Sequence, residues 1–151
     1  MNDEKVTIEI PISAPIEKLW KAWTDPALIS RWFGSDPDGT VMNAELDVRA
    51  GGTFEVTFKD SDQTEHTCSG VYKDVQEFRK LVFTWTWKSE PCVESFVTVQ
   101  LTPDIDFTRM LFEHAHLGTA SSHNYLSGWK STFAKLERLV RSEGATQATK
   151  F

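Results

Sequence analysis

Residues 122–141 constrain the fold more than any other stretch, because their apolar side chains recur at helical spacing. The stripe consists of Leu126, Trp129, Phe133, Leu136 and Val140. Residues three and four apart share one face of an α-helix, so the spacing predicts a long amphipathic helix, with Gly144 as its left-handed stop. Aromatic side chains of this size need a large partner surface. We expect that surface to be a curved antiparallel sheet.

Seven other segments are typical of β-strands, because apolar and polar residues alternate within them or short polar turns separate them. They are residues 6–12, 41–48, 53–59, 64–75, 80–88, 93–101 and 107–116. Between the first two we expect two short helices, one starting at Ser13-Ala14-Pro15 with Ser13 or Ala14 as its cap, the other covering residues 27–32. The pattern predicts an α+β fold in which about six to seven antiparallel strands wrap around the long C-terminal helix.

Length and charge narrow the classes of function. A chain of 151 residues is expected to form a single domain over residues 1–151, with a frayed tail at about 143–151. Its formal net charge is −6, and its basic residues are scattered, which argues against nucleic-acid binding. No apolar run is long enough to span a bilayer, and the start of the sequence does not resemble a signal peptide. We therefore expect a cytoplasmic protein with no membrane span.

The chain is rich in aromatic residues, with six Trp and ten Phe. Such residues are the usual lining of apolar cavities. A sheet that curls around one helix is expected to leave a hollow between them, although the same residues could instead fill a packed core. The candidate ligand-binding residues are Trp32, Phe33, Phe54, Val56, Phe58, Trp85, Trp87, Val97, Val99, Met110, Phe112, His114, His116, Trp129 and Phe133.

Two histidines, His114 and His116, fall on one face of the last strand. A metal site of the His-x-His kind would need a carboxylate a few residues on and a histidine from a later strand; neither is found, so no metal and no cofactor are expected. We expect His114 to be either a polar anchor for a ligand or a structural histidine bonded to backbone. Nucleophile motifs are absent, apart from His66 two residues before Cys68, so no catalytic residue is assigned.

Several short motifs occur in a fixed order and together resemble one known family. They are Trp23-Thr24-Asp25-Pro26, Arg31-Trp32-Phe33-Gly34, Asp47-x-Arg49-x-Gly51-Gly52, Gly70-Val71-Tyr72, Leu81-Val82-Phe83-Thr84-Trp85, Thr108-Arg109 with His114, and Gly128-Trp129. This order resembles the SRPBCC (START/birch-pollen-allergen-like) superfamily, and within it the branch similar to the C-terminal domain of the activator of heat-shock protein ninety ATPase. The family's Trp-Trp-Gly-Pro stands here as Trp32-Phe33-Gly34-Ser35, which could reshape the pocket entrance.

The resemblance implies a helix-grip fold with a deep pocket for a small hydrophobic ligand, and it places the family histidine at His114. It leaves three functions open, because one fold can serve several. The leading hypothesis is a protein that binds a small hydrophobic or amphipathic molecule, and we expect a binder rather than an enzyme. The others are a chaperone-interaction module with a role in the stress response, and an enzyme of the cyclase or hydrolase kind using His114 as acid or base. Edge strands could also pair two copies into a homodimer.

Overall fold

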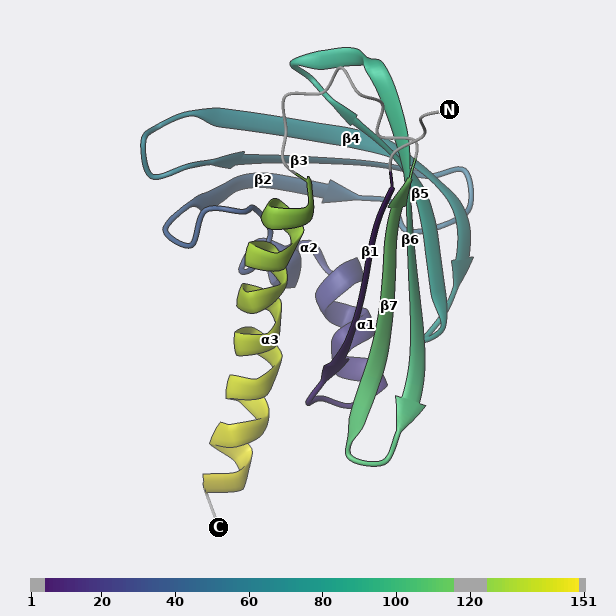
Figure 1. Ribbon diagram of the computed structural model, residues 1–151, viewed down its shortest axis with the longest axis vertical. Helices are drawn as coiled ribbons and strands as arrows, with labels where there is room; N and C mark the ends of the chain where they lie inside the picture. The colour runs from purple at the N-terminus through teal and green to yellow at the C-terminus, as the bar shows by residue number, and fades with distance from the viewer. Residues whose placement is uncertain (1–4, 116–124, 150–151) are drawn as a thin grey trace.

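A strongly bent antiparallel sheet packs against one long helix in the computed structural model (Figure 1). The structure describes residues 5–115 and 125–149, and within them all side chains except those at 92–93 and 142–149. The elements are β1 (Lys5–Ile12), α1 (Ile16–Thr24), α2 (Pro26–Ile29), β2 (Thr40–Leu46), β3 (Thr53–Lys59), β4 (Glu65–Gln76), β5 (Lys80–Trp87), β6 (Glu90–Asp104), β7 (Phe107–Ala115) and α3 (Tyr125–Thr149).

The seven strands form a single sheet in the order β1-β7-β6-β5-β4-β3-β2. Consecutive strands from β2 to β7 are hairpin neighbours, whereas β1 and β2 lie at opposite edges and are connected through α1 and α2. In Figure 1 strands β1, β6 and β7 run roughly along α3, while β2 and β3 cross near its first turn. The register slips at irregularities in β2, in β4 and in β6 where it pairs with the end of β5, and bulges increase local twist and bending. The predicted α+β helix-grip architecture is confirmed.

All seven predicted strands are present, but their ends differ from the prediction. Strand β6 has fifteen residues, and it begins at Glu90 and ends at Asp104, because the turns on both sides are tighter than the polar separators suggested. Glu90 already pairs with Trp87, and Asp104 pairs with Phe107, which leaves two residues in each turn. Asp106 in the second turn has φ of 68°, a left-handed conformation that Asp tolerates in hairpin turns.

The two short helices differ from their predicted ends. Helix α1 begins after Pro15, which makes no side-chain capping bond, so the predicted cap at Ser13 or Ala14 is wrong. Helix α2 starts as its sequence indicated, with the Asp25 carboxylate accepting a hydrogen bond from the Ala27 amide at 2.9 Å. It ends at Ile29 rather than at Trp32. Trp32 is buried and donates its indole N–H to the carbonyl of Ala22 at 2.9 Å, so the chain turns inward there.

Helix α3 extends from Tyr125 to Thr149. It passes through Gly144, so the predicted stop is wrong, and residues 143–149 continue the helix where we expected a frayed tail. A single interior glycine costs a helix only about 1 kcal/mol, and the alanines that follow are strong helix formers. Leu126 is 45% exposed and Tyr125 takes its place in the buried stripe. None of the described helices is both long and apolar enough to cross a membrane.

Aromatic rings from both layers fill the space between α1, α3 and the sheet. Phe112 of β7 lies at the centre: its ring centroid is 4.5 Å from that of Trp129 and 4.9 Å from that of Phe133. On its other side Trp23 stacks at 6.4 Å with an interplanar angle of 20°. Trp32 packs on Trp23 at 4.9 Å. This part of the expected hollow is therefore a solid core.

At Gly70 the backbone of β4 lies close to that of β5. A Cβ atom at this position would lie 2.0 Å from the backbone oxygen of Thr84, which cannot move without breaking the ladder. We predict that Gly70→Ala lowers the free energy of unfolding by about 1–3 kcal/mol, the range for overpacking. Urea unfolding measures this change.

The control is Gly128→Ala in α3, where the added Cβ meets only the Ser35 side chain at 3.6 Å. There the same substitution should be neutral or stabilise by up to about 1 kcal/mol, because Ala is the better helix former. Equal effects of the two substitutions would contradict the role of backbone approach at Gly70.

Candidate functional site

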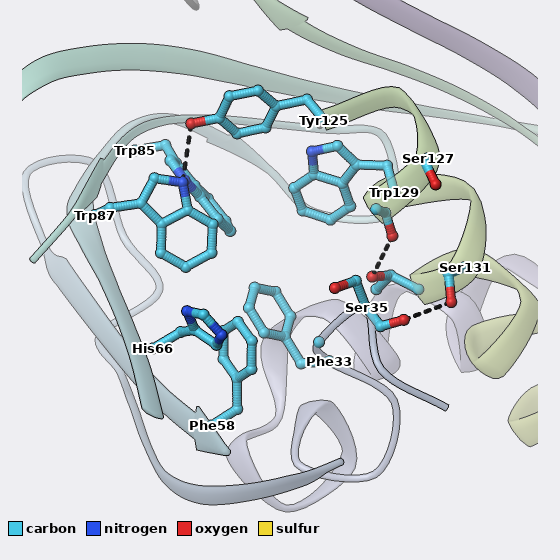
Figure 2. Close-up of a pocket in the computed structure, with 13 residues that line it drawn as sticks. Phe33, Ser35, Phe58, His66, Trp85, Trp87, Tyr125, Ser127, Trp129 and Ser131 are labelled. Atoms are coloured by element: carbon cyan, nitrogen blue, oxygen red, sulfur yellow. Dashed lines mark hydrogen bonds between the residues drawn. The ribbon is translucent and has the colours of Figure 1, made fainter. Parts of the chain in front are cut away.

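A cavity of about 370 Å³ opens between the start of α3, the loop after α2, and strands β3, β4 and β5 (Figure 2). Its volume lies within the ordinary range for small-molecule sites, about 300–1,000 Å³. It is lined by Phe33, Gly34, Ser35, Phe58, His66, Trp85, Trp87, Tyr125, Ser127, Gly128, Trp129, Ser131 and Thr132.

One part of the wall is aromatic. Trp85 and Trp87 alternate on β5 and so face the same way, and their rings meet edge to face at 5.2 Å. Phe33 lies 5.8 Å from Trp85 and 5.7 Å from Phe58, and Trp129 of α3 is 5.3 Å from Trp85. The cavity is therefore framed by rigid apolar surfaces.

The opposite part of the wall, on α3, carries hydroxyl groups. Ser127, Ser131 and Thr132 lie on successive turns and face the cavity with Gly128. Two of these hydroxyls donate to backbone: Thr132 Oγ1 to the Gly128 carbonyl at 2.8 Å, and Ser131 Oγ to the Ser35 carbonyl at 2.5 Å (Figure 2). Each oxygen retains lone pairs that can accept a hydrogen bond. The cavity is thus amphipathic, because it is lined both by aromatic rings and by the hydroxyl groups of α3.

The loop at the mouth is held on both sides. Besides the Ser131 bond, the Lys135 ammonium donates to the Asp36 carbonyl at 2.9 Å. The Asp36 carboxylate accepts from the amide and the hydroxyl of Ser61, both at 2.8 Å, and these bonds lower the pKa of Asp36. Gly34 has φ of +104°, and a Cβ there would meet Phe58 at 3.0 Å, so glycine is required. The Phe33 and Ser35 of the motif both line the cavity.

His66 is a cavity residue that the sequence analysis did not place at the site. Its Nε2 lies 2.8 Å from the Asp60 carboxylate, and its ring centroid is 5.3 Å from Phe58 and 5.9 Å from Trp87. The available signal was the alternation of β4, which places His66 on the inward face with Cys68. Cys68 itself is fully buried, and desolvation raises the pKa of its thiol. The thiol is therefore not an activated nucleophile.

His114 does not line the cavity, so of its two expected roles the structure favours the structural one, although its partners are side chains and not backbone. It is fully buried and both ring nitrogens are used. Trp129 Nε1 donates to His114 Nδ1 at 3.0 Å, so the neutral ring carries its proton on Nε2, which donates to Ser95 Oγ at 2.7 Å. Ser95 in turn donates to the Trp85 carbonyl at 3.2 Å. His114 is a structural histidine joining α3 to the sheet.

The predicted site residues divide into two groups. Those that line the cavity are Phe33, Phe58, Trp85, Trp87 and Trp129. Those placed in the packed core away from it are Trp32, Phe54, Val56, Val97, Val99, Met110, Phe112, His114 and Phe133. His116 lies outside the described residues. Alternation therefore identified the inward faces correctly, but it did not distinguish core from cavity.

Tyr125 closes one end of the cavity, and the sequence analysis did not place it there either. Its hydroxyl accepts a hydrogen bond from Trp87 Nε1 at 2.9 Å (Figure 2), and its ring packs 4.7 Å from that of His114. The first turn of α3 is thereby tied to β5. Among the described residues, no group of three or more His, Cys, Asp or Glu side chains is placed to hold a metal ion.

The family comparison decides the classification. Residues 13–141 match the model of the family described as "Activator of Hsp90 ATPase homolog 1-like protein". The chain belongs to this family. It is an AHSA1-like domain of the SRPBCC superfamily, as the motif order predicted. None of the curated protein sequences compared with this AHSA1-like chain matches it.

Solved structures show the same fold. A Nitrosomonas europaea protein superimposes with a TM-score of 0.80 at 23% identity, covering 93% of this chain and 96% of its own. A Chromobacterium violaceum protein gives 0.82 at 20% identity, covering 91% and 97%. An AHSA1-like protein from Aeromonas hydrophila gives 0.76 at 23% identity, covering 93% and 94%. At these identities the likeness of the AHSA1-like domain to its neighbours concerns the fold alone.

Burial of His114 gives a pH dependence that can be measured. Desolvation lowers the pKa of His114 from 6.5 to about 3, so between these values the unfolded AHSA1-like chain binds a proton that the folded chain does not. Above about pH 6.5 the His114 ring is neutral in both states and does not lower the free energy of unfolding. As the pH falls from 6.5 toward 3, protonation of the unfolded chain lowers the free energy of unfolding. The loss should reach about 2 kcal/mol by pH 5, at about 1.4 kcal/mol per pH unit.

The comparison variant is His114→Gln, which cannot titrate. It should be less stable than the original chain at pH 7.5, because the Trp129 and Ser95 bonds are disturbed, but its stability should fall less between pH 7.5 and pH 5. Urea unfolding at the two pH values measures both. An unchanged pH dependence in the variant would show that His114 is not the group responsible.

Proposed function

We propose that this AHSA1-like domain binds a small apolar or amphipathic molecule in the cavity between α3 and strands β3–β5. The observation that carries the proposal is the mixed lining of the cavity, which combines aromatic rings from the sheet and α3 with hydroxyls from α3. The space of about 370 Å³ is open to solvent at its mouth. A ligand that enters it would cover the aromatic rings of the wall, and burial of that apolar surface would supply affinity.

Binding is the better supported activity, compared with catalysis at His114. A general acid or base must reach a substrate and change its protonation state near the working pH. His114 is fully buried, both of its nitrogens are bonded, and its pKa is lowered to about 3. These properties suit a histidine that joins α3 to the sheet by hydrogen bonds. The cyclase or hydrolase hypothesis therefore loses the residue on which it rested.

The test of ligand binding uses uncharged naphthalene and alkyl probes. Trp85, Trp87 and Trp129 line the cavity, so an occupant should change the tryptophan fluorescence. At a hundredfold excess over Kd it should also raise the Tm by about 5–10 °C. A broad probe set that moves neither signal would count against the proposal.

A blocking variant ties the signal to this cavity. Gly128→Leu adds an isobutyl group to the α3 wall and should weaken probe binding at least about tenfold, because the added side chain occupies the site. Lys130→Leu is the matched control, since Lys130 is exposed two residues along the same helix and does not line the cavity. Equal binding by the two variants would place the probe elsewhere.

A second candidate function follows from the family match, which names an activator of the Hsp90 ATPase. If the domain acts as a chaperone-interaction module, adding it to Hsp90 should change the rate of ATP hydrolysis. The measurement is a steady-state assay of ATP hydrolysis by Hsp90 over a range of domain concentrations. The comparison is the Gly70→Ala variant, added so that the concentration of folded domain is the same. No change in rate at saturating domain would exclude this role for the isolated chain.

A further inference from the structure

A second pocket lies next to the main cavity, where the end of α2, the loop before β2 and the middle of α3 meet. Its volume is about 310 Å³, at the lower end of the range for small-molecule sites, about 300–1,000 Å³. Phe33 lines both this pocket and the main cavity. Because Arg31, Lys135 and Arg138 all line it, we call it the basic pocket.

Positive charge is concentrated at the basic pocket. Lys135 and Arg138 are three residues apart on α3 and so lie on one face of the helix, and Arg31 reaches the same pocket from the turn after α2. No Asp or Glu is among the described residues that line the pocket, although the chain as a whole has a formal net charge of −6. The pocket is therefore a basic recess on an acidic protein.

The protein balances the charges on α3 only in part. The ion pairs among the described residues do not include Arg138, and its side chain is exposed. By contrast Arg141, three residues further along α3, pairs with Glu137 at 3.3 Å. The Lys135 ammonium donates one of its three N–H groups to a neutral acceptor, the Asp36 carbonyl. Both cations on α3 can therefore donate to an added anion.

The pKa of Lys135 reflects the same imbalance. Burial lowers this pKa, and the positive charge of Arg138 lowers it further, while Asp36 and Asp60 act in the opposite direction. The Asp36 carboxylate itself accepts hydrogen bonds from the amide and the hydroxyl of Ser61, and it does not line the pocket. An anion placed between Lys135 and Arg138 would reduce their repulsion. The charge pattern thus favours an anionic ligand.

We infer that the basic pocket binds a small organic phosphate monoester, whose phosphate contacts Lys135 and Arg138 of α3 and Arg31 of the turn after α2. A phosphate monoester carries a charge of about −1.5 to −2 at pH 7 and presents three acceptor oxygens. Guanidinium groups match these oxygens with paired N–H donors, and an ammonium binds them as a point charge. A carboxylate brings a single charge and two oxygens, so it suits three cations less well. This second site does not depend on occupancy of the main cavity.

Phosphate monoesters occur as free metabolites and as lipid headgroups, and the overall charge favours the free source. An anionic bilayer would repel a domain with a net charge of −6, whereas a small ligand meets only the local field of the pocket. We therefore expect no sedimentation of the chain with vesicles of phosphatidylcholine and phosphatidate. Sedimentation with these vesicles that requires Arg138 would overturn the assignment to a free ligand.

The test uses phenyl phosphate, with phenol as its uncharged counterpart. A ¹H–¹⁵N titration should show saturable shifts at the amides of Ser30, Arg31 and Gly39, which line the pocket, with a Kd on the order of 1 mM or below. Phenol should cause no saturable shifts there. Raising the salt concentration should weaken phenyl phosphate binding, because salt screens exposed charges. No saturable shift at these amides with phenyl phosphate would overturn the inference.

The variants separate a specific site from a general effect of charge. Arg138→Ala should weaken phenyl phosphate binding about tenfold, the effect of losing a charged hydrogen-bond donor. Arg141→Ala is the matched control, because it removes the same charge from the same helix, but Arg141 pairs with Glu137 and does not line the pocket. It should leave the affinity nearly unchanged. Both arginines are exposed, so neither substitution should unfold the chain.

A further variant distinguishes the two sites. Gly128→Leu blocks the main cavity and should leave phenyl phosphate binding unchanged, because Gly128 does not line the basic pocket. Loss of binding in folded Gly128→Leu, or equal losses in Arg138→Ala and Arg141→Ala, would overturn the inference. Failure of the uncharged probes to bind in the main cavity would count against the proposed function alone. Loss of affinity confined to Arg138→Ala supports the phosphate site.

Discussion

The contact between Trp129 and the pair Phe112 and His114 is the one on which the rest of the structure depends. The Trp129 ring packs 4.5 Å from that of Phe112, while its indole N–H bonds to His114. The apolar contact supplies burial, and the hydrogen bond sets the rotation of α3 about its axis, because an indole N–H has a single direction. With that rotation set, Tyr125 reaches Trp87 and Ser131 reaches the loop at Ser35.

The cavity follows from this placement and from the bend of the sheet. Where β1, β6 and β7 run along α3, rings from both layers meet and the interior is solid. Toward β3 and β4 the strands cross near the first turn of α3, as Figure 1 shows, and the cavity lies between Phe58 and Trp87 of the sheet and Gly128 and Ser131 of α3. The hydroxyls of α3 then face space that no side chain fills. The site is thus a product of sheet curvature and of small residues on the helix.

This placement also changes the chemistry assigned to the site. Sequence motifs directed attention to His114, the most obvious polar group on an apolar face. The fold uses that histidine to connect α3, β6 and β7, and it leaves His66 and the α3 hydroxyls among the polar groups of the cavity. An acid–base mechanism at His114 would need that ring to reach a substrate, and the fold places it in the core instead.

Local pattern was enough to determine the strands, their inward faces and the stripe of α3, because the periods of two and 3.6 residues depend only on backbone geometry. The motif order likewise identified the family. Tertiary structure alone decided that Phe112 and Phe133 are core while Trp85 and Trp87 line a cavity, since a period shows which way a side chain points but not whether the opposite side is occupied. The same limit explains why the roles of His114 and His66 were not predicted. His114 is bonded to Trp129 and Ser95, which are distant in sequence, and His66 is bonded to Asp60 across a turn. Only the folded chain brings these partners within bonding distance.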